Sequence, residues 1–268
     1  MTDRLSSFPQ IRVFCQNVNR NYGYMDTLLA SLDGMYDLLL IQEPPWAFIR
    51  SAPSSSTRDG EDVVGPPISP NWGCVYRQSS LDDPPRVATY FSHRIKPLRP
   101  SYRRDLIDHR DILVLSLGLG MGSALFANVY SDDNHTAISA LHEGAEVWPN
   151  LLVMGGDFNV RHKNWDPDYR PDSNIHAERL VAAADRLGLT RCLPSVAGPT
   201  HFPFNRNLSP TVIDLIFVRD ELSLQIVHHI LPDDRGPSDH APLIVTVPGP
   251  DSLVPVMSHR QSWMRKTD

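Results

Sequence analysis

Acidic, amide and imidazole side chains recur in this sequence where short apolar runs begin or end. They are Glu43, Asp157, Asn159, Asp214, Asp239 and His240. Apolar runs of this length predict strands, and the ends of strands form a rigid rim at which a sheet can hold a ligand. Carboxylates are hard ligands for a divalent cation, and a carboxylate beside an imidazole can move protons. The pattern favours such chemistry at one edge of a sheet.

Asp214 is the member of this set that is hardest to explain as a surface residue. It lies within the apolar run Thr211–Val218, where an unpaired carboxylate would cost several kcal/mol. We expect a buried partner for it. That partner is an imidazole, which the carboxylate would orient and hold protonated, or an arginine in a structural ion pair.

The other members are weaker signals when each is taken alone. Asp157 and Asn159 are two positions apart, so their side chains share a face if the chain is extended, but Asp-x-Asn is also a common turn former. Residues 238–240 read Ser-Asp-His and offer an oxygen ligand next to an imidazole. Neighbours in extended chain point to opposite sides, so these two reach one site only if the chain bends there.

The elements that must position these groups follow from the periodicity of apolar residues. Helices are predicted at residues 25–32, ending near Gly34, at 137–147, and at 175–187 with Asn174 as N-cap. Strands are predicted at residues 11–15, 37–42, 73–77, 86–91, 112–117, 124–130, 151–154, 212–218, 222–231 and 242–247, with a long loop at 51–70. The strands outnumber the helices and do not alternate with them, which favours an α/β sandwich with mixed sheets. We place one domain at about residues 8–248, and a tail or the start of a linker at 249–268.

Composition limits the class of protein. A chain of 268 residues with 41% hydrophobic and 21% charged residues is neither disordered nor a coiled coil, and three scattered cysteines exclude a disulfide scaffold. No apolar run approaches the roughly 18 residues of a membrane helix, and the polar first ten residues hold no signal-peptide core, so we expect an intracellular protein. The net charge of −6 argues weakly against a protein that merely coats DNA. Residues 86–111, however, carry seven basic and three acidic side chains, a local charge of +4, which suits phosphate contacts or an ordinary solvated surface.

The polar residues described above belong to six short motifs that follow one another along the chain. They are Gln16-Asn17-Val18-Asn19, Ile41-Gln42-Glu43-Pro44, Asn128-Val129-Tyr130, Gly155-Gly156-Asp157-Phe158-Asn159, Ile213-Asp214-Leu215-Ile216 and Ser238-Asp239-His240. With them, residues 11–247 resemble the endonuclease/exonuclease/phosphatase superfamily, and within it the apurinic-endonuclease-like endonuclease domain of non-LTR retrotransposons. The resemblance implies a DNase I-like fold, a four-layer α/β sandwich of two packed mixed β-sheets flanked by helices.

This chain departs from that family in two respects. Asn19 stands where many relatives carry aspartate, which puts a catalytic part for this position in doubt. The reverse transcriptase of complete elements is absent from the sequence, so we expect a fragment, a processed domain or a stand-alone derivative.

The resemblance also implies roles for individual residues. Glu43 and Asp239 would hold Mg²⁺, or Mn²⁺ in its place, with Asn17 nearby. Asp157 would activate the attacking water, and His240, oriented by Asp214, would donate to the phosphoryl group. The expected catalytic residues are Asn17, Tyr130, Asp157, Asn159, Asp214 and His240, and the expected contacts to the DNA backbone are Arg103, Arg104, Arg161 and Lys163.

We therefore expect a Mg²⁺-dependent endonuclease that nicks duplex DNA to leave a 3′-hydroxyl, without an organic cofactor, and in the nucleus if it acts in retrotransposition. Two alternatives remain at this point: a phosphatase of an inositol or lipid phosphate, and an inactive remnant that binds nucleic acid. No Gly-x-Ser-x-Gly, Walker, His-Glu-x-x-His or Cys-x-x-Cys motif points elsewhere. The pair His228-His229 is expected on a strand surface rather than at a metal.

Overall fold

The computed structural model describes residues 8–53, 61–78, 83–119, 122–144, 148, 151–171 and 173–249. One six-stranded sheet has the order β13-β14-β1-β2-β6-β5. Its strands are β1 (Gln10–Asn17), β2 (Leu38–Gln42), β5 (Trp72–Tyr76), β6 (Val87–Ser92), β13 (His228–Ile230) and β14 (Leu243–Pro248). A second six-stranded sheet has the order β11-β12-β10-β9-β8-β7. It contains β7 (Ser101–Tyr102), β8 (Ile112–Leu119), β9 (Gly122–Tyr130), β10 (Leu151–Asp157), β11 (Leu189–Arg191) and β12 (Asp214–Arg219).

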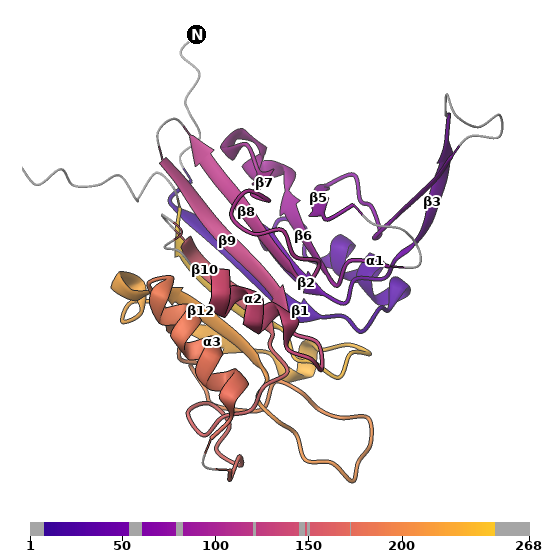
Figure 1. Ribbon diagram of the computed structural model, residues 1–268. Coiled ribbons are helices and arrows are strands. Elements are labelled where there is room, and N and C mark those ends of the chain that lie inside the picture. Colours follow the sequence, from indigo (N-terminus) through magenta and orange to yellow (C-terminus); the bar gives the residue numbers. More distant parts are fainter. Residues whose placement is uncertain are drawn as a thin grey trace, which may run out of the picture.

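The two sheets pack face to face, and helices cover their outer faces (Figure 1). Between the sheets lies a core of buried apolar side chains that includes Val13, Leu40, Phe126 and Ile216. Helix α1 (Tyr22–Ser31) packs on the first sheet, and helices α2 (Thr136–Gly144) and α3 (Ile175–Arg186) pack on the second. The expected four-layer α/β sandwich of two mixed sheets is confirmed.

The three predicted helices are present, although α1 begins three residues before the predicted Met25. The apolar spacing of α1 puts Met25, Leu28 and Leu29 on the buried face. Asn174 caps α3 as expected, because its side chain accepts from the backbone N–H groups of His176 and Ala177. None of the helices among the described residues is long and apolar enough to span a bilayer.

The strand directions bring the ends of four strands to one edge of the sandwich. β1 and β2 are parallel, as are β9 and β10, so the residues that follow these strands emerge at the same edge of their sheets. β12 runs antiparallel to β10 and pairs Asp214 with Asp157, so it begins where β10 ends. β14 likewise begins where β1 ends. The topology alone therefore gathers the ends of the predicted motifs.

A buried pair of amides joins the two sheets below this edge. Gln42 Nε2 donates to Asn128 Oδ1 over 2.6 Å, and Asn128 Nδ2 donates to the carbonyls of Ile41 and Ala88. Both amides are fully buried, so each hydrogen bond satisfies a group that would otherwise be orphaned. Asn128 thus has a structural role within its motif, as a link between β9 and the β2–β6 pair.

Asp37 secures the connection from α1 to β2. Its buried carboxylate accepts hydrogen bonds from the backbone and guanidinium of Arg12 and from the guanidinium of Arg94. Burial alone would raise the pKa of Asp37, but the hydrogen bonds from Arg12 and Arg94 outweigh it and hold the pKa below its usual value.

The structure corrects three predictions. Within the predicted loop 51–70, β3 (Ala47–Ala52) and β4 (Glu61–Gly65) form a separate hairpin that projects from the sandwich (Figure 1), while residues 54–60 lie outside the described residues. The Ser-, Gly- and Pro-rich composition of residues 51–70 hid the two short strands. The predicted strand 222–231 is wrong over its first half: a 3₁₀ turn spans Asp220–Leu222, Leu224 is fully exposed, and only His228–Ile230 pair.

The third correction concerns the histidine pair at the start of β13. His229 is exposed, as expected, but His228 is buried, because its backbone bridges Pro194 and its ring faces the interior. Burial, with the nearby Arg191, lowers the pKa of His228 to about 4. The predicted end of the second helix at 145–147 and the predicted tail beyond residue 249 lie outside the described residues.

Candidate active site

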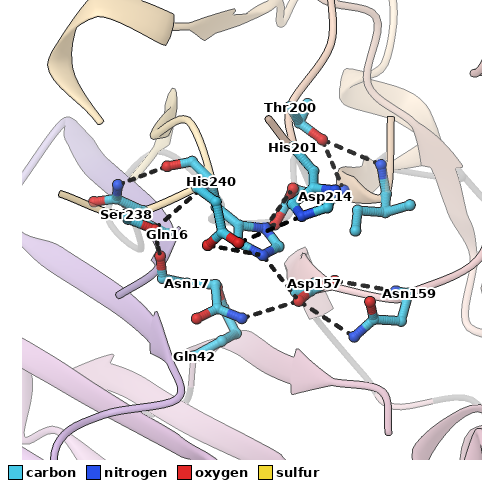
Figure 2. A network of polar contacts seen from close by, with 12 residues as sticks. Gln16, Asn17, Gln42, Asp157, Asn159, Thr200, His201, Asp214, Ser238 and His240 are labelled. Carbon is cyan, nitrogen blue, oxygen red and sulfur yellow. Dashed lines mark hydrogen bonds and ion pairs between the residues drawn. The ribbon is translucent and has the colours of Figure 1, made fainter. Parts of the chain in front are cut away.

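Asn17 is the centre of the polar network at the shared edge (Figure 2). It is the last residue of β1, and its Nδ2 donates to Asp157 Oδ2 over 3.0 Å and, more weakly, to Glu43 Oε2 over 3.4 Å. Its Oδ1 accepts from the backbone N–H of Asn19 over 2.9 Å. One amide therefore joins the ends of β1, β2 and β10.

The sharp end of β10 aims Asp157 and Asn159 at each other. Asn159 has a left-handed backbone, with φ of 50°, and its N–H donates to Asp157 Oδ1 over 3.1 Å. Its Nδ2 donates to the carbonyl of Ser131 over 2.8 Å and to Asp157 Oδ2 over 3.3 Å. The two side chains meet as expected, although a turn rather than an extended strand brings them together. Gly156 is required before this turn, because a Cβ there would lie 1.8 Å from the carbonyl oxygen of Val129.

Asp157 is buried and lies in an environment that suits a proton acceptor. Burial and, to a smaller extent, the charge of Asp214 raise the pKa of Asp157 to about 7, against the opposing influence of His240 and Asn17. Burial is the dominant cause because the 1%-exposed side chain has little water to solvate its charge. A pKa near neutrality is what a general base at physiological pH requires.

Asp214 and His240 form a buried pair. His240 Nδ1 lies 3.0 Å from both carboxylate oxygens of Asp214, and the backbone N–H groups of Ile213 and Asp214 donate to Thr200 Oγ1. The expectation of an imidazole partner for Asp214 is confirmed. Burial alone would lower the pKa of His240, but the carboxylates of Asp214 and Asp157 outweigh it and raise the pKa. The imidazole is thus held protonated, with Nε2 directed away from Asp214.

Residues 238–240 bend as the sequence required. Ser238 Oγ donates to the carbonyl of Asn17 over 2.7 Å and accepts from the backbone N–H of His240 over 3.0 Å. The bend brings His240 Nε2 within 3.9 Å of Asp239 Oδ1 and 3.8 Å of Asp157 Oδ2. Neighbours in sequence therefore face one site.

Glu43 has a strained backbone and a partly open carboxylate. Among the described residues, six non-glycine residues have positive φ, and Asn19, Arg20, Glu43 and Asn159 surround this site. Such strain is kept where the surroundings demand it, and it clusters at functional sites. The Glu43 carboxylate is 16% exposed, and Arg20, itself 64% exposed, donates to Oε1 over 2.8 Å.

The carboxylate oxygens of Glu43 and Asp239 are suitable ligands for a hard divalent cation. Mg²⁺ prefers one or two carboxylates and keeps several of its waters, so it needs carboxylate oxygens that solvent can reach. Glu43 and Asp239 both provide this, since each side chain is 16% exposed, whereas Asp157 and Asp214 are buried. Asn19, which replaces the aspartate of many relatives, donates weakly to Asp239 Oδ1 over 3.4 Å instead of adding a carboxylate.

Tyr130 ends β9 directly beside Asp157 in the ladder. Burial, together with the charges of Glu43 and Asp157, raises the pKa of Tyr130, so its hydroxyl keeps its proton. The Arg86 guanidinium lies 5.2 Å from the ring centroid and 3.9 Å from Asp111. A pocket of about 450 Å³ opens next to Glu43 and is lined by Arg20, Tyr22, Trp46, Arg86, Arg110 and neighbouring prolines.

The expected DNA-contacting residues lie apart from this network. Arg103 pairs with Asp105 over 2.6 Å and Arg104 with Asp108 over 2.7 Å, and Arg161 pairs with Asp166. Lys163 is exposed at a larger pocket of about 750 Å³ that reaches the far side of Asp214. Acidic neighbours therefore offset much of the local positive charge that the sequence suggested.

Sequence reasoning missed three residues at the site. His201 lies against Asp239 and His240, Thr200 supports the backbone of Asp214, and Arg20 pairs with Glu43. Thr200 and His201 stand in an irregular proline-rich segment without periodicity. The only sequence signal was a polar pair inside that segment.

Comparison with known proteins agrees with this fold. Residues 124–244 match the family model described as endonuclease-reverse transcriptase. The endonuclease domain of TRAS1, a telomere-specific non-LTR retrotransposon, is similar in structure at 16% identity, over 88% of this chain and 98% of that chain, with a TM-score of 0.59. An endonuclease/exonuclease/phosphatase family protein from Leptotrichia buccalis C-1013-b is similar at 12% identity, over 89% and 99% of the chains, with a TM-score of 0.54. No curated protein sequence matches this chain significantly. With its motifs assembled in this way, the chain has a DNase I-like fold and is similar to proteins of the endonuclease/exonuclease/phosphatase superfamily.

Proposed function

We propose that this protein is a Mg²⁺-dependent endonuclease that nicks duplex DNA and leaves a 3′-hydroxyl. One observation carries the proposal: an open carboxylate at Glu43, a buried base at Asp157 and a protonated imidazole at His240 lie around one amide network. Hydrolysis of a phosphodiester needs these three elements, because negative charge develops on the entering and leaving oxygens.

Glu43 and Asp239 would hold the Mg²⁺, with Asn17 positioned beside Glu43 by its amide. When bound, the cation neutralises charge that develops on the phosphoryl group. Arg20 would leave Glu43 at this point and become available to a phosphate oxygen, since its guanidinium pairs with that carboxylate.

Asp157 would orient the attacking water and take its proton. Its Oδ1 is held by the Asn159 N–H and its Oδ2 by Asn17, so the carboxylate cannot rotate freely. Asn159 would hold the same water or a non-bridging phosphate oxygen. General acid–base assistance of this type contributes about 10²–10⁴-fold to a rate.

His240 would donate a proton or hydrogen bond from Nε2 to the phosphoryl group. Asp214 sets the orientation of the ring by accepting from Nδ1, as an orienting carboxylate does for a catalytic histidine. Tyr130 keeps its hydroxyl proton and would donate it in a hydrogen bond to a phosphate or leaving oxygen.

DNA is the substrate favoured by two further observations. The pocket beside Glu43 combines Arg20, Arg86 and Arg110 with aromatic rings, a combination suited to phosphates and bases. The family model is that of endonuclease-reverse transcriptases, and TRAS1 is a retrotransposon. Contacts of Arg103, Arg104 and Arg161 with the backbone would require exchange of their acidic partners for phosphates, whereas Lys163 would reach a phosphate from its exposed position. A role in retrotransposition would place the protein in the nucleus.

The test is whether the purified protein nicks supercoiled plasmid in Mg²⁺. Glu43→Gln is the site variant. Glu221→Gln is the matched control, because the side chain of Glu221 is 78% exposed. We expect EDTA-sensitive conversion to open circles by the wild type and by Glu221→Gln, and loss of conversion by Glu43→Gln. Absence of nicking, or equal nicking by Glu43→Gln, would refute the proposal. Phosphate release from inositol or lipid phosphates without nicking would assign the same site to a different substrate.

A further inference from the structure

His201 lies on the site although it belongs to none of the motifs. Its Nε2 is 3.5 Å from Asp239 Oδ2, and its ring packs on that of His240 with centroids 4.7 Å apart and a 40° tilt. Figure 2 shows His201 next to the Asp214–His240 pair.

The backbone holds His201 in this place. Its N–H and carbonyl exchange hydrogen bonds with Thr211, and residues 201 and 240 form a bridge. The N–H of Phe202 donates to the carbonyl of Asp239 over 2.7 Å. His201, Asp239 and His240 are therefore positioned by one another and by the start of the last strand.

Both imidazoles have one nitrogen engaged by the protein and the other within 4 Å of Asp239, and His240 Nε2 also lies 3.8 Å from Asp157 Oδ2. His240 Nδ1 bonds to Asp214, and His201 Nδ1 lies 3.2 Å from Thr211 Oγ1. This is the arrangement in which proteins prepare metal-binding histidines, because the bond at one nitrogen sets the tautomer and aims the other.

We propose that His201 Nε2, His240 Nε2 and an oxygen of Asp239 form a binding site for a zinc-class transition-metal ion, separate from the Glu43 ligand for Mg²⁺. One ligand atom from each of the three residues lies within 4.8 Å of the others. Bonds of about 2.0–2.1 Å in a tetrahedron require ligand atoms about 3.3 Å apart. His201 Nε2 lies 3.5 Å from Oδ2 of Asp239 and His240 Nε2 lies 3.9 Å from Oδ1, so the two imidazoles approach different oxygens of one carboxylate. Binding of one ion through a single oxygen therefore requires the carboxylate to turn and the ligand atoms to close in.

The ligand types select zinc over magnesium. Two imidazoles and one carboxylate suit Zn²⁺, whereas Mg²⁺ takes oxygen ligands and keeps its waters. Asp239 supplies the carboxylate oxygen as the third ligand. Three protein ligands leave a fourth position for water or a phosphate oxygen.

Zinc at this site would inhibit the nuclease, a consequence that rests on the proposed function. The ion would displace the proton from His240 Nε2 to solvent, so that this atom could no longer donate to the phosphoryl group, and it would draw Asp239 away from Mg²⁺. Both ions would use Asp239, but inhibition should persist in excess Mg²⁺, because Mg²⁺ takes oxygen ligands and does not compete for the two imidazoles.

The binding itself is tested without substrate, by calorimetric titration of Zn²⁺ into the protein in a large excess of Mg²⁺, and by the visible absorption of Co²⁺ as a tetrahedral probe. The site variant is His201→Gln. The control is His229→Gln, which removes an exposed imidazole on β13. We expect the wild type to bind one Zn²⁺ per chain. The affinity for Zn²⁺ should be at least about tenfold weaker in His201→Gln and unchanged in His229→Gln and Glu43→Gln.

Equal zinc affinity in His201→Gln, or no binding in excess Mg²⁺, would overturn the inference. If His201→Gln does not fold, Thr211→Val decides, since it keeps all three ligands and removes only the Nδ1 partner of His201. Weaker zinc binding by Thr211→Val would support the site, and unchanged binding would refute it. Zinc binding by a protein that never nicks DNA would refute the proposed function and leave the zinc site standing.

Discussion

Asn17 at the end of β1 donates a 3.0 Å hydrogen bond to Asp157 at the end of β10, and this bond links the two sheets across the candidate site. Each residue is almost fully buried, so the bond satisfies groups that water does not reach. The geometry of the site therefore depends on how the sheets pack, and the amide pair Gln42–Asn128 beneath it maintains that packing.

Arg20→Ala should lower the Mg²⁺ concentration needed for half-maximal nicking by up to about fivefold. Arg20 donates to Glu43 over 2.8 Å, and this contact must break before the carboxylate can hold a cation. An exposed pair of this kind contributes about 0.2–1 kcal/mol, which limits the gain to that range. The measurement is the nicking rate as a function of Mg²⁺ concentration. An unchanged or higher Mg²⁺ requirement would show that Arg20 does not compete for Glu43.

Gly156→Ala should destabilise the protein by at least about 3 kcal/mol or prevent folding, because the added Cβ would meet the backbone of β9 rather than a movable side chain. Gly144→Ala, at the end of α2, is the matched control, since nothing lies within 4 Å of its Cβ. We expect the control to change stability by less than about 1 kcal/mol. Urea denaturation of both variants gives the comparison, and equal stabilities would contradict the close approach of β9 and β10.

Asp37→Asn should lower stability at neutral pH by about 1–3 kcal/mol and flatten its dependence on acid pH. The pKa of Asp37 is lowered on folding, so its carboxylate contributes stability above the unfolded value of about 3.9, and that contribution is lost as the pH falls through the folded value. Stability curves between about pH 2 and pH 7 test this. The exposed Asp26→Asn should keep the wild-type pH dependence. A wild-type slope in Asp37→Asn would exclude Asp37 as its source.

Much of the fold could be predicted because periodicity reports burial directly. The all-buried strand Leu38–Gln42 and the Asn174 cap are local signals, and both were confirmed. The β3–β4 hairpin was missed because its strands pair only with each other, outside the sandwich. The strand predicted at residues 222–231 was wrong over its first half, because the apolar residues of this stretch are split between an exposed turn and a short edge strand.

The site could be predicted from the sequence where a charged residue lies within an apolar strand. Asp214 in an apolar strand required a partner, and His240 is that partner. The place of His201 depends on a backbone bridge to residue 240, which no local pattern reveals. The ion pairs of Arg103 and Arg104 were also hidden, since a count of charges does not show which acids they face.

The rate of Mg²⁺-dependent plasmid nicking by Asp157→Asn, measured beside its melting temperature, tests the central claim most directly. Asparagine keeps the shape and removes the charge that burial disfavours, so we expect the rate to fall by about 10²–10⁴-fold while the melting temperature stays equal or rises. The exposed Asp185→Asn on α3 should match the wild type in both measurements. A nicking rate within a fewfold of wild type for Asp157→Asn would contradict the role of Asp157 as the base.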